Sequence, residues 1–300
     1  MTNDNLYLRF AAGPVTDETV SDEASASAGF AHAGARPFLI TPGRPTLHYA
    51  DLGDATGRLQ RRLQDLGVMP GDRVMVQVDK SPEAVVLYLA CLRVGAIYIP
   101  LNTAYTATEV EYFMGDATPR VFVSRPAARA ALAPIARRIR VAHLLELDDQ
   151  GGGSLLEGLD GLDPAPAVCV RQADDLAAIL YTSGTTGRSK GAMLSHGNLR
   201  SNADVLHRYW QWQDEDVLLH ALPVFHVHGL FVALHCALLG GSSVHFLPRF
   251  AADEVLARLP QCSVMMGVPT FYHRLLRVPI PSDLSSLRLC TSGSAPLPAS

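Results

Sequence analysis

The 300-residue sequence has few cysteines, and they are far apart. The five are Cys91, Cys169, Cys236, Cys262 and Cys290, and no two of them form a Cys-x-x-Cys pair. An odd number of distant cysteines argues against a disulfide framework and against a cysteine-rich zinc site. Unpaired thiols are typical of a reducing compartment, so the sequence predicts a cytoplasmic protein.

Long apolar runs are also absent. No stretch reaches the ~18 residues that a membrane-spanning helix needs, and the longest, near Gly229–Leu239, is interrupted by His235. The first residues lack the basic and apolar regions of a secretory signal peptide. The acidic residues between positions 17 and 23 argue against an organelle transit peptide. We therefore expect neither a membrane span nor a targeting segment.

No excess of positive charge is present, because the formal net charge is −4 with histidine neutral. This balance argues against a generally basic surface for nucleic acid. Hydrophobic residues make up 48% of the sequence and charged residues 18%, which excludes a disordered tail and allows a sizeable core. At ~150 residues per domain, this length predicts about two domains or one large one.

Helix and strand signals alternate along the first half of the chain. Apolar residues at helical spacing over 52–66 predict one helix, and Ser81-Pro82-Glu83 is a typical start for a second that runs to Gly95. Thr106 and Glu109 form a capping box ahead of a third helix. Strands are expected over 73–78, 96–101 and 121–124.

The second half repeats this alternation, which predicts an α/β protein with largely parallel sheets covered by helices. We expect strands over 177–182, 217–221, 243–247, 263–268 and 287–291, and helices near 197–209, 229–239, 252–259 and 270–277. Composition suggests a mobile segment over 1–36, a first α/β lobe over 37–166 and a second over 167–300. The Gly-, Asp- and Pro-rich stretch 148–166 separates the two lobes.

The most informative stretch is YTSGTTGRSKG at Tyr181–Gly191, which follows an apolar strand. Its glycines can turn backbone N–H groups toward an anion, its hydroxyls can donate to phosphate oxygens, and its two cations add charge. Composition alone equally allows an ordinary surface loop. A Walker-type P-loop is disfavoured because Ser189 stands where that pattern requires Gly. A dinucleotide fold is disfavoured because no G-x-G-x-x-G follows a strand.

Four ordered motifs resemble the acyl-adenylate-forming superfamily of AMP-dependent synthetases and ligases. They are YTSGTTGRSKGAMLSH (181–196), ALPVFHVHGL (221–230), GVPTFYHRLL (267–276) and TSGSAPL (291–297). Within that superfamily, PLNTAYTATEVEYF (100–113) and the Arg in the third motif resemble malonyl-CoA synthetases. The resemblance implies the N-terminal large domain of that fold. It also implies an acid–CoA ligase that uses ATP, Mg²⁺ and coenzyme A, with malonate as the acid.

The resemblance also implies site residues. The residues that would bind the β- and γ-phosphates are Thr182, Ser183, Gly184, Thr185, Thr186, Gly187 and Lys190. Those that would line the acyl pocket or contact AMP are His226, Val227, His228, Arg274, Ser292 and Ser294. No residue within 1–300 is assigned as catalytic, and no direct metal ligand is expected. The family's adenylation Lys and magnesium-binding Glu would follow Ser300.

Several of these residues have plainer explanations. His226 and His228 can be structural histidines, Ser292 and Ser294 can shape a turn, and Arg274 can be a solvated helix residue. A guanidinium nevertheless suits a second carboxylate, which is costly to bury without a partner. Val227 stands where some malonate enzymes carry Thr, and an apolar residue there can admit a 2-alkyl malonate.

Three functions stay open at this point. The first is a malonyl-CoA synthetase of which this chain is the N-terminal portion. The second is a ligase for another short-chain or 2-alkyl dicarboxylic acid. The third is a nucleotide-binding chain without activity, which is suggested by an end at Ser300 directly after a strand and turn. On the first two hypotheses, the 300 residues alone are expected to be nearly inactive.

Overall fold

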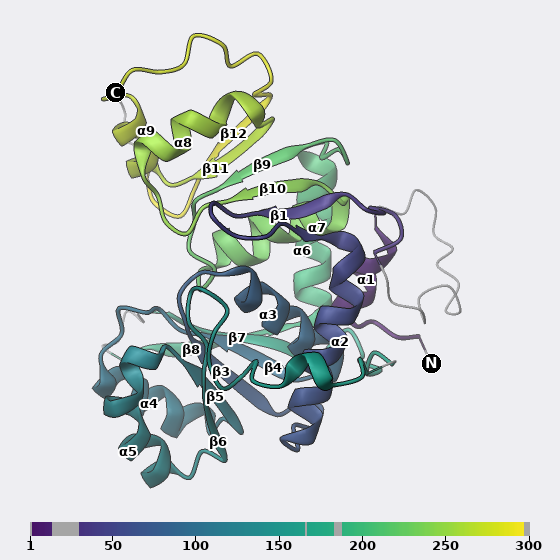
Figure 1. Cartoon of the computed structure of the whole chain (residues 1–300), viewed down its shortest axis with the longest axis vertical. Helices are drawn as coiled ribbons and strands as arrows, with labels where there is room; N and C mark the ends of the chain where they lie inside the picture. Colours follow the sequence, from purple (N-terminus) through teal and green to yellow (C-terminus); the bar gives the residue numbers. More distant parts are fainter. Residues whose placement is uncertain (1, 14–29, 166, 183–187, 297–300) are drawn as a thin grey trace. The chain divides into compact units, whose positions relative to one another are not determined.

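A computed structural model describes residues 2–13, 30–165, 167–182 and 188–296 (Figure 1). The chain forms two compact units. Unit 1 consists mainly of Leu52–Ser201, and unit 2 mainly of Gly29–Asp51 and Asn202–Ser300. The structure therefore divides the chain differently from the sequence-based boundary at residue 166.

Unit 1 contains a six-stranded sheet in the order β6-β5-β3-β4-β7-β8. Its strands are β3 (Arg73–Gln77), β4 (Ile97–Pro100), β5 (Val121–Ser124), β6 (His143–Glu146), β7 (Leu176–Thr182) and β8 (Lys190–Ser195). Neighbouring strands from β6 to β7 are parallel, whereas β7 and β8 pair antiparallel. The first five strands therefore end at one common edge, which we call the carboxyl edge of unit 1.

Helices of unit 1 begin where the sequence supplies caps. Helix α3 (Pro82–Val94) begins after Ser81, whose side chain accepts from the Ala84 N–H, and α4 (Ala107–Ala117) begins with the complete Thr106–Glu109 capping box. Helix α5 (Arg129–Ile139) was not anticipated. Apolar side chains of α4 and α5 pack on the sheet, and α3 is buried along nearly its whole length. Short 3₁₀ turns lie at Pro126–Ala128 and Leu159–Gly161.

Unit 2 also contains a six-stranded sheet, in the order β12-β11-β9-β10-β1-β2. Its strands are β1 (Pro37–Ile40), β2 (Leu47–His48), β9 (Val217–His220), β10 (Ser243–Phe246), β11 (Val264–Gly267) and β12 (Leu289–Ser292). All neighbours are parallel except β1 and β2. The carboxyl ends of β9 to β12 consequently share one edge, the carboxyl edge of unit 2.

The helices of the second half fall close to their expected positions. They are α6 (His196–Tyr209), a π-helical segment (His228–Leu234) continued by α7 (His235–Gly240), α8 (Ala252–Arg258) with a 3₁₀ turn (Leu259–Gln261), and α9 (Pro269–Leu275). Side chains of α8 and α9 form one core with residues of β9 and β11. Helix α2 (Tyr49–Asp65) begins after β2.

Three expectations differ from the structure. Residues 1–36 are not uniformly a mobile segment, because Leu6–Ala12 form helix α1, with Leu6, Tyr7 and Phe10 fully buried; residues 14–29 lie outside the described residues. Strands β1 and β2 were not expected; β1 has four residues and β2 only two. Strand β8 was treated as part of the loop motif, because it is rich in small residues and largely exposed.

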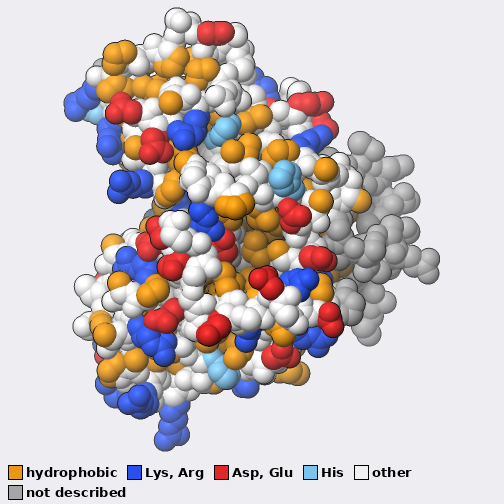
Figure 2. All heavy atoms as spheres, viewed as in Figure 1, with side chains coloured by type: hydrophobic (Ala, Val, Ile, Leu, Met, Phe, Trp, Pro, Cys, Tyr) orange, Lys and Arg blue, Asp and Glu red, His pale blue; other side chains and the backbone are white. Residues whose placement is uncertain are grey.

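The described surface carries charges of both signs. Over the face in Figure 2, Lys and Arg side chains are interspersed with Asp and Glu side chains. None of the described helices combines the length and apolarity that crossing a bilayer requires. All five cysteines are free thiols.

Candidate functional site

The predicted phosphate loop connects the two strands of a β-hairpin at the carboxyl edge of unit 1. Thr182 ends β7 and lies opposite Lys190, which begins β8. Both side chains are exposed. The other predicted phosphate contacts, Ser183, Gly184, Thr185, Thr186 and Gly187, lie outside the described residues. The base of the hairpin is thus a polar, accessible position at the edge where parallel sheets collect ligands.

Helix α4 anchors both strands of this hairpin. The Tyr181 hydroxyl donates to the Asp116 carboxylate at 2.5 Å, and the Tyr112 hydroxyl donates to the Ser189 carbonyl at 3.0 Å. The Arg188 guanidinium lies 5.7 Å from the centre of the Tyr112 ring. Burial and the adjacent Asp116 raise the pKa of Tyr181, so this phenol stays protonated. These contacts fix where the loop leaves the sheet.

The end of the same motif is a structural anchor. His196 begins α6 and is fully buried, and its Nδ1 accepts from the Leu6 N–H at 3.1 Å. Burial lowers the pKa of His196 to about 4, so the ring is neutral at pH 7. The motif therefore joins α1 to unit 1 through this histidine, a contact that sequence inspection did not suggest.

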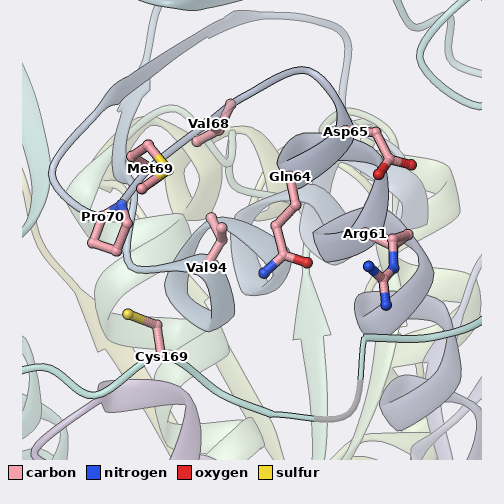
Figure 3. Close-up of a pocket in the computed structure, with 8 residues that line it drawn as sticks. All are labelled: Arg61, Gln64, Asp65, Val68, Met69, Pro70, Val94 and Cys169. Carbon is pink, nitrogen blue, oxygen red and sulfur yellow. The ribbon is translucent and has the colours of Figure 1, made fainter.

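A pocket of about 480 Å³ lies at the opposite edge of the unit 1 sheet (Figure 3). Its walls include Val68, Met69 and Pro70 ahead of β3, and Val94 at the end of α3. Cys169 also lines it, and burial raises the pKa of this thiol. Because these residues precede the strands, the pocket is separate from the hairpin loop.

In unit 2, the His-x-His motif follows β9 at the carboxyl edge. His226 and Val227 are exposed, and His228 is half-buried at the start of the π-helical segment. Burial and the neighbouring His226 lower the pKa of His228, so it is neutral at pH 7. Position 229 requires glycine because the backbone there passes close to Pro223: an added Cβ would lie 2.1 Å from the Pro223 carbonyl oxygen.

The loop after β12 is joined to this motif. The Ser294 hydroxyl and the Nδ1 atom of His228 lie 3.3 Å apart and share a hydrogen bond. Ser294 has a φ of 66°, in the left-handed region that few non-glycine residues adopt. Ser292 ends β12 and is exposed. This hydrogen bond brings two of the predicted substrate residues together. Within the described part of the chain, Ser292 makes no hydrogen bond to His226 or His228.

The motif that contains Arg274 forms the third part of this edge. Helix α9 begins at Pro269 directly after β11, and the Tyr272 hydroxyl donates to the Thr291 carbonyl at 2.5 Å. The Gly293 N–H donates to the Gly267 carbonyl at 3.1 Å. These two bonds tie α9 and β11 to the loop that carries Ser294.

Arg274 is exposed in the last turn of α9. Its guanidinium carbon lies 4.9 Å from the centre of the Phe250 ring, which follows β10. Among the described residues, no hydrogen bond or ion pair involves this guanidinium. Its N–H donors are therefore available to a ligand at the carboxyl edge of unit 2.

The sequence placed the predicted residues of unit 2 on the correct edge, but it missed several that shape it. Tyr112 and Tyr272 lie within quoted motifs without having been assigned a role, and Asp116 lies just after one. Phe250 lies in no motif, so no sequence signal identified it. The roles of the predicted residues stay predictions.

This chain is similar to several known proteins. Residues 27–300 match the family described as AMP-binding enzyme. A feruloyl-CoA synthase of an Amycolatopsis species is 34% identical over 87% of this chain and 52% of its own length. The mitochondrial malonate–CoA ligase ACSF3 of Bos taurus is 32% identical over 97% of this chain and 53% of its own length.

One solved structure shares a higher sequence identity with this chain than these two relatives do. The ATP-bound crystal structure of MatB from Rhodopseudomonas palustris is 44% identical, with a TM-score of 0.88, over 99% of this chain and 56% of that one. This neighbour confirms the predicted fold class, with mixed sheets flanked by helices. The chain spans about half the length of the curated relatives it matches.

Proposed function

Because the chain belongs to the AMP-binding enzyme family, we propose that it carries part of the site of an ATP-dependent acid–CoA ligase whose acid is malonate. In the first step, a carboxylate oxygen attacks the α-phosphorus of ATP, and the bond to the oxygen that bridges to the β-phosphate breaks. Pyrophosphate leaves. The CoA thiol then loses its proton to solvent and its sulfur attacks the acyl carbonyl of the acyl-adenylate; the bond between the acyl carbon and the phosphate oxygen breaks, and AMP leaves.

The hairpin loop of unit 1 is the proposed phosphate site. Lys190 and the hydroxyl of Thr182 face solvent at its base, where a cation and a donor can contact the β- and γ-phosphates. The carboxylate is already ionised at pH 7, so the first step needs positioning and charge stabilisation rather than a general base.

Magnesium would enter with ATP, bound to the phosphate oxygens of the nucleotide rather than to a cluster of side chains. The described residues contain no group of three or more His, Cys, Asp or Glu side chains that could hold a metal ion. The exposed Lys190 can contact phosphate without a metal.

Arg274 is the observation that carries the choice of malonate. Its guanidinium, which has no hydrogen bond or ion pair among the described residues, lies at the carboxyl edge of unit 2, as do His228 and Ser294. A monocarboxylate has no second negative charge that could pair with this guanidinium. The distal carboxylate of malonate can bind it in a bidentate manner. The similarity to a malonate–CoA ligase supports the same acid.

A 2-alkyl malonate is a second candidate acid. Val227, between the two histidines of the motif, is 45% exposed. An apolar side chain there can contact an alkyl group on the central carbon without burying a polar atom.

An acid panel tests the proposal. The full-length protein that contains this sequence would be given ATP, CoA and one of malonate, methylmalonate, butyrate or ferulate, with acyl-CoA measured by mass spectrometry. We expect the highest kcat/KM for malonate or methylmalonate. Preference for butyrate or ferulate would contradict the dicarboxylate assignment, and no acyl-CoA from any acid would contradict the ligase proposal.

A further inference from the structure

Two aromatic rings and one guanidinium form a stack at the carboxyl edge of unit 2. Phe250, in the turn between β10 and α8, is stacked on Phe271, with ring centres 4.0 Å apart and planes at 17°. Arg274 lies over the same Phe250 ring at 4.9 Å. Because Phe271 and Arg274 are three residues apart on α9, one helical turn presents both to Phe250.

A stacked guanidinium keeps its hydrogen-bonding capacity. The contact with the ring is a cation–π interaction, which engages none of the five N–H groups of the guanidinium in a hydrogen bond. A carboxylate can therefore bind two of these N–H groups without breaking the stack. No described residue occupies those donors.

The stack also limits the freedom of an exposed side chain. Arginine has many rotamers, and ordering them on binding costs affinity. A ring that is held by a second ring restricts the guanidinium before any ligand arrives. Phe250 is itself half-buried, and it packs against the core formed by α8, α9, β9 and β11.

We propose that Phe250 is a positioning residue that holds Arg274 ready for the distal carboxylate of the acid. The inference rests on the proposed function and assigns specificity to a residue outside all the motifs. Phe250 does not touch the acid; it acts through Arg274. Removing the ring should therefore weaken binding of a dicarboxylate and leave a monocarboxylate unaffected.

Phe250→Leu and Phe250→Met in the full-length protein test this, with Phe250→Tyr as the matched variant that keeps the ring. A cation–π contact at an exposed site corresponds to about a 2- to 5-fold change. We expect Leu and Met to lower kcat/KM for malonate by about that factor, mainly through KM, with butyrate unchanged and Tyr close to wild type. In an Arg274→Ala background, Phe250→Leu should cause no further loss.

Other results would overturn the inference. Equal losses for malonate and butyrate, or a further loss in the Arg274→Ala background, would show that Phe250 only supports the fold. Malonate preference that survives both Leu and Met unchanged would refute the inference and leave the proposed function intact. If the wild-type protein does not use malonate, the proposed function fails first and this inference fails with it.

Discussion

The Arg274 guanidinium contacts the Phe250 ring, and its N–H groups make no hydrogen bond to any described residue. Hydrogen bonds to charged groups contribute ~1.5–3 kcal/mol, or roughly 10- to 150-fold in affinity. We expect Arg274→Ala in the full-length protein to lower kcat/KM for malonate by at least tenfold and to leave butyrate nearly unchanged. Arg277→Ala is the control, because Arg277 is also exposed but contacts His273. Equal losses with both acids would assign Arg274 to the fold.

Asp216 is a buried carboxylate with a structural role. It is 4% exposed, and it accepts from the Arg288 guanidinium and from the Ser263 hydroxyl, the latter at 2.6 Å. The Gln213 N–H donates to its other oxygen at 2.8 Å. Burial alone would raise the pKa of Asp216, but the hydrogen bonds from Arg288, Ser263 and Gln213 lower it below its usual value.

This shift predicts a pH-dependent stability. Because the folded-state pKa is below the unfolded one, Asp216 stabilises the fold above about pH 4 and loses this contribution as pH falls through the folded pKa. Asp216→Asn should lower the free energy of unfolding at pH 7 by about 1.5–3 kcal/mol.

Urea unfolding at several pH values checks this prediction. The difference from wild type should stay constant between pH 7 and 5 and shrink below about pH 4. Glu254→Gln is the control, because it breaks an exposed pair with Arg258 that contributes only about 0.3–0.5 kcal/mol. A difference that grows as the pH falls would contradict the assignment.

At the scale of elements, helix α4 and the β7–β8 hairpin act as one assembly. Tyr112→Phe removes the hydroxyl that donates to the Ser189 carbonyl and keeps the ring near Arg188. A typical hydrogen bond contributes about 0.5–1.5 kcal/mol, so the KM for ATP should rise about 2- to 12-fold in the full-length protein, with kcat less affected.

The matched control is Tyr105→Phe, because no hydrogen bond of the Tyr105 hydroxyl is found among the described residues and its ring packs on Phe113. This variant should leave the KM for ATP unchanged. An equal rise in both variants would mean that the aromatic cluster, rather than the anchoring bond, determines nucleotide affinity.

At the scale of the whole molecule, the chain spans about half the length of its curated relatives. If the other half of such a relative contributes to the same site, positioning of the reactants, which can be worth ~7–11 kcal/mol, is incomplete without it. We expect purified residues 1–300 to form less than about one hundredth of the acyl-CoA formed by the full-length protein. Comparable turnover by both would contradict this expectation.

Local signals in the sequence predicted much of the fold. Residues 121–124 form the expected strand, Ser81 and the Thr106–Glu109 box cap the expected helices, and α8 and α9 lie within one or two residues of their predicted bounds. These features depend on residues close in the chain. Strand β8 was missed because half of its residues are small and its apolar residues do not alternate with polar ones.

The sequence by itself determined the family, many of the strands and helices, and the loops that lie at each carboxyl edge, because spacing, caps and motifs are local. Only the tertiary structure decided that β1 pairs with β10, about 200 residues away, and that β7 and β8 join the sheet of β3 to β6. It also placed Phe250 beneath Arg274. Strand pairing and ring stacking join residues that are distant in the chain, so no local pattern records them.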